Sequence, residues 1–174
     1  MDNSRKERLV LFITTLAGIS CILQNHFGNW EFWMPYVVLV IGIILWWVHL
    51  TGKIDPYTRV SLYFAYAAFL LFYHGIHDTS LFDISVSVAL FIVTYSLADR
   101  IVMLNLILAE YIIVMAMQFY FLYRNVQMDM SAFDTMRIVY HVGTVLVMYV
   151  FSRITVSHRI SERESISKWQ QSVR

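Results

Sequence analysis

Long, continuously apolar stretches constrain this chain more than any other feature. Each approaches or exceeds the ~20 residues that a helix needs to cross about 30 Å of hydrocarbon. Six of them follow one another within the 174 residues: Leu9–Gln24, Trp33–Leu50, Val60–Ile76, Leu81–Ala98, Ile101–Tyr123 and Arg137–Ser157. The connections between them are too short to fold as separate domains. The pattern therefore predicts a chain that crosses a bilayer about six times.

The composition supports helices rather than strands in these stretches. The chain is 59% hydrophobic and 14% charged, whereas about a quarter of an ordinary soluble domain is charged. Only helices and closed barrels satisfy every backbone group in lipid. Barrel strands alternate polar and apolar residues, but these stretches are apolar throughout. We predict an all-α fold: a polytopic membrane bundle of about six transmembrane helices with a cytoplasmic C-terminal helical extension.

The basic residues gather on one side of this arrangement. Lysine and arginine are typical of the cytoplasmic side of membrane proteins. Eleven of the thirteen fall on the side of the two termini, and only Arg124 and Arg137 fall on the other side. We therefore predict an integral membrane protein with both termini in the cytoplasm. The basic residues flank the bilayer, which is the expected partner, and form no face for nucleic acid.

The sixth stretch continues beyond the membrane. Residues 152–174 contain no glycine or proline and extend it as a charged helix. Ile166, Trp169 and Val173 are spaced by three and four residues, which is typical of a dimer seam. We expect a bundle over residues 1–157, a linker helix over residues 158–174 and a homodimer. The pattern reaches Arg174 without a stop signal, which favours a chain cut there over a complete protein with a basic, solvated tail.

A compact bundle of about six helices that runs into a charged helix, Ile160–Ile166, resembles the membrane input modules of bacterial signalling proteins. Sensor histidine kinases and membrane-bound diguanylate cyclases have this layout. The resemblance implies a sensory module of a two-component or related system in the bacterial inner membrane. It also implies an exit helix that dimerises and passes a change in packing to a cytoplasmic output domain. Any kinase or cyclase activity would then lie beyond Arg174.

Two other functions stay open at this point. The six short helices are similar to the substrate-capture subunits of vitamin transporters. That family carries an Ala-x-x-x-Ala motif in its first helix, where this chain has Ala17 and Cys21. A membrane-embedded enzyme is the other alternative, but the chain has no metalloprotease, nucleophile-elbow or phosphate-binding glycine motif. The sequence therefore predicts no catalytic residue, and no pattern in it names a cofactor.

Ionisable residues within the apolar stretches are the candidate site. Glu110 lies near the middle of the fifth stretch, where such groups are costly and often functional. His74 and His77 lie at the outer end of the third stretch, and His141 lies in the outer half of the sixth. Imidazole can bind a ligand, a proton, a transition metal or haem iron. We predict a ligand or signal site bounded by these four residues; the alternative is a hydrogen-bonded Glu110 and interfacial histidines.

Overall fold

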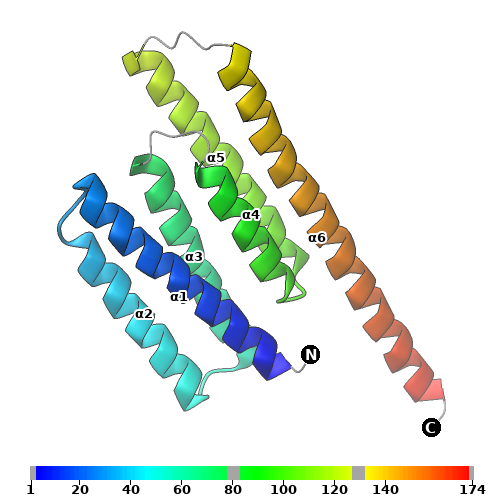
Figure 1. The fold of residues 1–174 in the computed structure, drawn as a ribbon. Coiled ribbons are helices and arrows are strands. Elements are labelled where there is room, and N and C mark those ends of the chain that lie inside the picture. The colour runs from blue at the N-terminus through cyan, green and yellow to red at the C-terminus, as the bar shows by residue number, and fades with distance from the viewer. Residues whose placement is uncertain (1–2, 78–82, 127–131, 173–174) are drawn as a thin grey trace.

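The structure is a computed structural model that describes residues 3–77, 83–126 and 132–172. Within these ranges the chain forms six helices: α1 (Asn3–Gly28), α2 (Met34–Thr51), α3 (Pro56–His77), α4 (Asp83–Ser96), α5 (Ile101–Val126) and α6 (Ala132–Ser172) (Figure 1). The predicted all-α class and the order of the helices are confirmed. Among the described residues, five helices are long and apolar enough to cross a membrane. These helices indicate an integral membrane protein.

The fourth helix ends two residues before the predicted end at Ala98. Its described part has 14 residues, or about 21 Å, less than the thickness of the hydrocarbon layer. It ends at Ser96 because residues 97–99 form a turn that is closed by three backbone hydrogen bonds of 3.1–3.2 Å. Asp99 in this turn has a φ of 55°, in the left-handed region that aspartate adopts more readily than most residues. The turn leads directly into α5.

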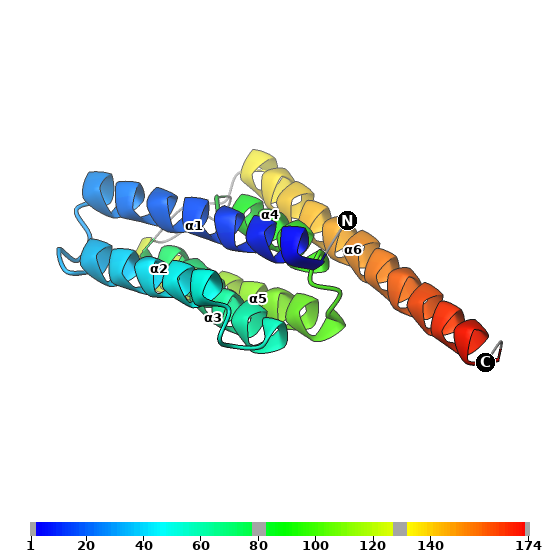
Figure 2. The ribbon, with the colours of Figure 1, turned by 90° about the horizontal axis from the view of Figure 1, so that it is seen from below.

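α3 is the central helix and packs against α1, α2, α4 and α5. α2 lies at one edge of the bundle, and α6 lies at the opposite edge against α4 and α5 (Figures 1 and 2). Both chain ends lie at the same end of the bundle as the α2–α3 connection and the α4–α5 turn (Figure 1). We call this the inner end. The end that carries the α1–α2 connection, residues 29–33, is the outer end.

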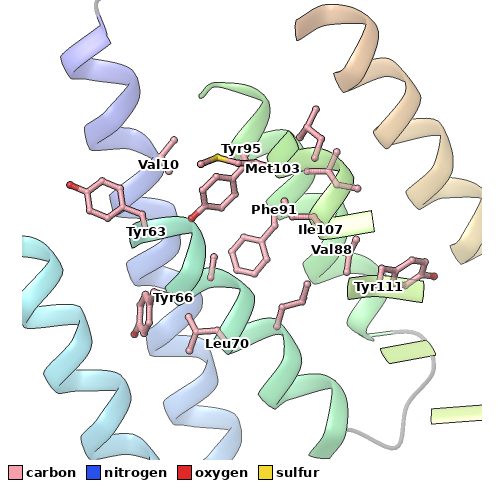
Figure 3. Close-up of a cluster of buried hydrophobic side chains, with 14 of the residues drawn as sticks. Val10, Tyr63, Tyr66, Leu70, Val88, Phe91, Tyr95, Met103, Ile107 and Tyr111 are labelled. Atoms are coloured by element: carbon pink, nitrogen blue, oxygen red, sulfur yellow. The ribbon is translucent and has the colours of Figure 1, made fainter. Parts of the chain in front are cut away.

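Hydroxyl groups of buried tyrosines join neighbouring helices in the core (Figure 3). The bonded pairs, separated by 2.9–3.1 Å, are Tyr66 with the Val38 carbonyl, Tyr95 with Thr14, and Tyr111 with Ser85. They connect α3 to α2, α4 to α1 and α5 to α4. Burying apolar side chains gains little in lipid, because the lipid tails are equally apolar. Hydrogen bonds and close packing therefore hold these helices together.

α6 is one continuous helix of 41 residues, about 60 Å long. It passes residues 157 and 158 without a break, and its last turns project beyond the inner end of the bundle (Figures 1 and 2). The predicted helical extension is therefore confirmed. Ile166 and Trp169 on this extension are 58% and 67% exposed. Val173, the third residue of the predicted dimer seam, lies outside the described residues, and dimerisation stays a prediction.

Candidate ligand site

The α1–α2 connection positions the first part of the site. Asn29 has a φ of 51°, and the Trp30 N–H donates to the Asn25 carbonyl at 3.2 Å. This is the six-residue hydrogen bond that commonly closes a helix whose last turn ends in a left-handed residue. Asparagine adopts that conformation with little strain. The turn therefore brings Trp30 and Glu31 against the outer end of α3.

A hydrogen-bonded cluster forms where this connection meets α3. The Glu31 carboxylate accepts a hydrogen bond from the Tyr73 hydroxyl at 2.5 Å, and His77 Nε2 lies 3.0 Å from it. Asn25 Nδ2 donates to the Tyr73 hydroxyl at 2.9 Å. His77 Nδ1 lies 2.9 Å from the Tyr73 carbonyl, so both ring nitrogens face acceptors. We call Asn25, Trp30, Glu31, Tyr73 and His77 the outer cluster.

The outer cluster stabilises the charged form of its carboxylate. The hydrogen bonds from Tyr73 and then from His77 lower the pKa of Glu31 to about 2. A carboxylate that accepts several hydrogen bonds is favoured over its protonated form, which can accept fewer. The Trp30 ring packs against His77, with ring centroids 5.0 Å apart and the ring planes 35° apart. Glu31 is therefore fixed as an anion at the outer surface of the bundle.

A cleft of about 310 Å³ opens beside this cluster, between α1, α3 and α4. Most of its walls are apolar; the lining residues are Ile13, Leu16, Ala17, Ser20, Cys21, Gln24, Leu70, Leu71, His74, Ser87, Leu90 and Phe91. The hydrogen bond between Thr14 and Tyr95 joins α1 to α4 nearer the inner end. From there the two helices diverge toward the outer end (Figure 1). The cleft occupies the space between them.

The cleft has one polar end. His74 Nδ1 lies 2.7 Å from Gln24 Oε1, which places an imidazole and a side-chain amide next to each other. A second hollow of about 410 Å³ shares Ser20, Gln24 and His74 with the cleft and adds Trp30 and Asp83. The polar end of the cleft therefore leads toward the outer end of the bundle. The imidazole of His74, the amide of Gln24 and the hydroxyl of Ser20 can together donate hydrogen bonds to a polar group of a ligand and accept hydrogen bonds from it.

Comparison of this chain with protein-family models, curated proteins and solved structures gives no match. We therefore infer the function from the geometry of the site. Within the described ranges, no group of three His, Cys, Asp or Glu side chains lies close enough to hold a metal ion. The side chains at the polar end, Gln24 and His74, are suited to hydrogen-bonding a ligand.

The structure brings two of the four predicted site residues together. His74 and His77 both lie near the Trp30 ring, with ring centroids 6.2 and 5.0 Å from its centre; His74 lines the cleft and His77 belongs to the outer cluster. Glu110 is half-buried on α5 and hydrogen-bonds the backbone of Phe72 on α3. His141 is half-buried on α6, and the described parts of α3 and α6 do not touch. Neither Glu110 nor His141 occurs among the described residues that line the cleft.

The sequence does not predict the remaining polar residues of the site. Gln24 and Asn25 stand at the end of an apolar stretch, where polar residues usually mark the membrane boundary. The only local signal is their position directly before the Gly28-Asn29 turn. That turn fixes how the connection folds back, and hence which residues of α1 meet α3.

Two further carboxylates lie at the inner end and bind basic side chains. Glu7 on α1 contacts Arg59 Nε at 2.5 Å and Arg59 Nη2 at 2.9 Å, with His49 and Tyr63 each 3.3 Å away. Its side chain is only 7% exposed. We call Glu7, His49, Arg59 and Tyr63 the inner cluster. It ties α1 to the ends of α2 and α3.

Asp99 in the α4–α5 turn is the second inner carboxylate. Its oxygens bind Lys6 of α1 at 2.8 Å and two arginines of α6, Arg159 at 2.9 Å and Arg163 at 2.7 Å. Arg159 also donates to the Ser96 carbonyl at 2.8 Å. The sequence gives no sign of this node, because Lys6 and Asp99 lie 93 positions apart and the two arginines come from a third segment, still further along the chain. Asp99 thus connects α6 to α1 and to the end of α4.

Proposed function

We propose that this chain is a membrane sensory module that binds a small molecule in the cleft and relays binding through α6. The position of α4 carries the proposal. α4 contributes Ser87, Leu90 and Phe91 to the cleft, and α6 packs along α4. A ligand that displaces α4 would therefore act on α6 without any further connection.

The cleft suits a small molecule with an apolar body and one hydrogen-bonding head. Its volume lies at the lower end of the ~300–1,000 Å³ that is usual for small-ligand sites. Leu16, Leu71 and Phe91 would cover the apolar body, while Gln24 and His74 would bind the head. Because the cleft opens between membrane helices, such a molecule has access from the bilayer as well as from the outer end.

The relay needs two packings of the bundle with different affinities for the ligand, since equal affinities would shift nothing. The Thr14–Tyr95 hydrogen bond holds α1 and α4 together near the inner end. A ligand wedged into the cleft would tilt α4 about this point. α4 leads into the turn that carries Asp99, whose carboxylate binds Arg159 and Arg163. The tilt would reach α6 through both packing and ion pairs.

In this proposal α6 carries the signal into the cytoplasm of a bacterium, as a homodimer, to an output domain such as a kinase or cyclase. The basic residues at the inner end support the orientation, because cytoplasmic sides are rich in lysine and arginine. The exposed apolar side chains of Ile166 and Trp169 support self-association of the extension.

Filling the cleft tests the proposal. Ser87→Trp places a large side chain in the cleft, and the matched variant Leu39→Trp fills the separate groove between α1 and α2. Cys21 is the only cysteine and lines the cleft, but it is only 4% exposed, so a further fall in its slow alkylation by N-ethylmaleimide reports that the cleft is filled. In a Cys21→Ser background, spin labels at Lys53 and Ser167 measure the distance between α6 and the inner end of the bundle. We expect Ser87→Trp to shift this distance and Leu39→Trp to leave it unchanged.

A filled cleft with an unchanged α6 would contradict the relay. That result would favour the capture of a transported substrate, which uses a ligand cleft but needs no movement of an exit helix. Equal shifts in both variants would show that α6 responds to general disturbance of the bundle, and the relay through α4 would again be wrong.

A further inference from the structure

A further cavity, of about 180 Å³, lies at the inner end between α1, the start of α3, the α4–α5 turn and α6. Three cationic side chains line it: Lys6, Arg100 and Arg163. The other lining residues include the apolar side chains of Val10, Val60 and Leu97. The cavity is separate from the ligand cleft, and none of its described lining residues belongs to that cleft.

Positive charge exceeds negative charge around this cavity. The cations in and directly around it are Lys6, Arg59, Arg100, Arg159 and Arg163, and the carboxylates are Glu7, Asp55 and Asp99. The side chains of Glu7 and Asp99 are only 7% and 8% exposed, because the basic groups already surround them. The excess of two positive charges is therefore left without a protein anion in the described residues.

Asp99 cannot neutralise the cations that share it. Lys6 Nζ and Arg163 Nη2 bind the same carboxylate oxygen, at 2.8 and 2.7 Å, and Arg159 binds the other at 2.9 Å. One negative charge thus faces three positive charges. The Arg163 side chain is 55% exposed, so it can turn from Asp99 toward an anion in the cavity at little cost.

Arg100 has no carboxylate among its described hydrogen-bond and ion-pair partners, although Asp55 lies near enough to attract it. Its guanidinium donates to Ser61 Oγ at 2.9 Å and to the Tyr57 carbonyl at 3.0 Å, and it stacks 3.4 Å from the centre of the Tyr57 ring. Burial lowers the pKa of Arg100, since a charge taken out of water loses solvation. A bound anion would offset that loss.

We infer that this cavity binds a phosphate group, supplied by the headgroup of an anionic phospholipid. Lys6, Arg100 and Arg163 present charged donors to it, and planar guanidinium groups match phosphate oxygens well. The apolar part of the lining suits the glycerol and first methylene groups of a lipid rather than a freely soluble anion. Anionic lipids also gather where basic residues meet the cytoplasmic leaflet. This inference does not depend on the proposed sensory function.

Lipid binding to the full chain in detergent, followed by native mass spectrometry, tests the site. We expect dioleoylphosphatidylglycerol to bind more tightly than dioleoylphosphatidylcholine. Arg100→Gln and Arg163→Gln should each weaken phosphatidylglycerol binding about fivefold, the usual effect of one basic residue near an anionic surface. The matched control is Arg8→Gln, which removes the same charge from an exposed position on α1 outside the cavity. The affinity of Arg8→Gln for phosphatidylglycerol should stay close to that of the unmodified chain.

Inorganic phosphate, titrated against the lipid-free protein, separates the two sources of the phosphate group. Binding of phosphatidylglycerol that depends on Arg100 or Arg163, with no such binding of inorganic phosphate, supports the lipid. Binding of inorganic phosphate alone would overturn the lipid assignment. No preference for phosphatidylglycerol, or an equal loss in Arg8→Gln, would overturn the site. If Arg100→Gln fails to fold, Arg163→Gln still tests the site, because the half-exposed Arg163 side chain can be replaced without disturbing the core.

Discussion

The two ends of the bundle use their carboxylates differently. At the outer end, Glu31 is held by a tyrosine and a histidine, and its side chain is 41% exposed. At the inner end, Glu7 and Asp99 are almost fully buried; Glu7 binds Arg59 in addition to His49 and Tyr63, and Asp99 binds Lys6, Arg159 and Arg163. The exposed carboxylate thus has a tyrosine and an imidazole as its described side-chain partners, while each of the buried ones also binds a permanent cation.

This difference follows from the free energy of burying charge. A carboxylate removed from water needs a permanent counter-charge and hydrogen bonds, and losing either is costly. A half-exposed carboxylate keeps part of its hydration and needs less from the protein. The inner end is therefore fixed by ion pairs. The outer end, where the cleft opens, is held by hydrogen bonds to a half-exposed carboxylate, which a ligand can change.

Glu7→Gln should have the largest effect on stability and should separate the two ends most clearly. Glutamine can accept one hydrogen bond, but it cannot neutralise the buried Arg59 guanidinium. Breaking a buried pair by removing one partner costs about 3 kcal/mol or more. We expect a loss of that size in the free energy of unfolding by sodium dodecyl sulfate in mixed micelles. The matched substitution at the outer end, Glu31→Gln, should cost far less at neutral pH.

The double variant Glu7→Gln/Arg59→Gln removes both charges and checks the cause. It should recover part of the stability that Glu7→Gln loses, because no uncompensated charge remains. Equal losses in Glu7→Gln and Glu31→Gln, or no recovery in the double variant, would show that the two ends do not differ in this way.

The helices and their order could be predicted from the sequence, because lipid leaves the backbone few alternatives. A long apolar stretch must form its hydrogen bonds within itself, so each stretch is read as a helix without knowledge of its neighbours. The same local reasoning predicts the continuity of α6 from its lack of glycine and proline after Ser152. The end of α4 at Ser96 was not predictable, since the turn at residues 97–99 carries neither glycine nor proline.

The neighbours of each helix could not be predicted, and most of the site depends on them. His74 and His141 have similar predicted depths, yet α3 and α6 lie on opposite sides of α4 and α5. Lys6, Glu7 and Asp99 look like ordinary boundary charges in the sequence. Their roles arise only because α1 lies beside α3 and near the α4–α5 turn. Depth follows from hydropathy, but lateral position follows from side-chain packing.

Gly75→Ala should disturb the outer end by an intermediate amount. A Cβ atom at this position would lie 2.3 Å from Val114 Cγ1, so α3 and α5 would have to separate near His74. Overpacking of this kind costs about 1–3 kcal/mol, measurable by the same unfolding method. Val114→Ala should relieve the clash in the double variant Gly75→Ala/Val114→Ala.

Gly143→Ala is the matched control, because a Cβ atom there meets no described atom within 4 Å. A similar loss of stability in Gly75→Ala and Gly143→Ala would contradict the close approach of α3 and α5.

Acidification should produce the smallest effect, and it should come from the outer end. The pKa of Glu31 is lowered from an ordinary value of 4.5 to about 2 by its hydrogen bonds from Tyr73 and His77. Folding therefore favours the ionised form, and this contribution is complete above pH 4.5 and is lost as the pH falls toward 2. The difference in unfolding free energy between the unmodified chain and Glu31→Gln should shrink over that range. Tyr73→Phe removes the strongest of these hydrogen bonds, so it should raise the pKa of Glu31 in the folded chain. The pH range over which the difference shrinks should then end at a higher pH.

A difference that stays constant between pH 5 and pH 2 would show that Glu31 is not held as an anion. The contrast between the two ends would then rest on the inner carboxylates alone.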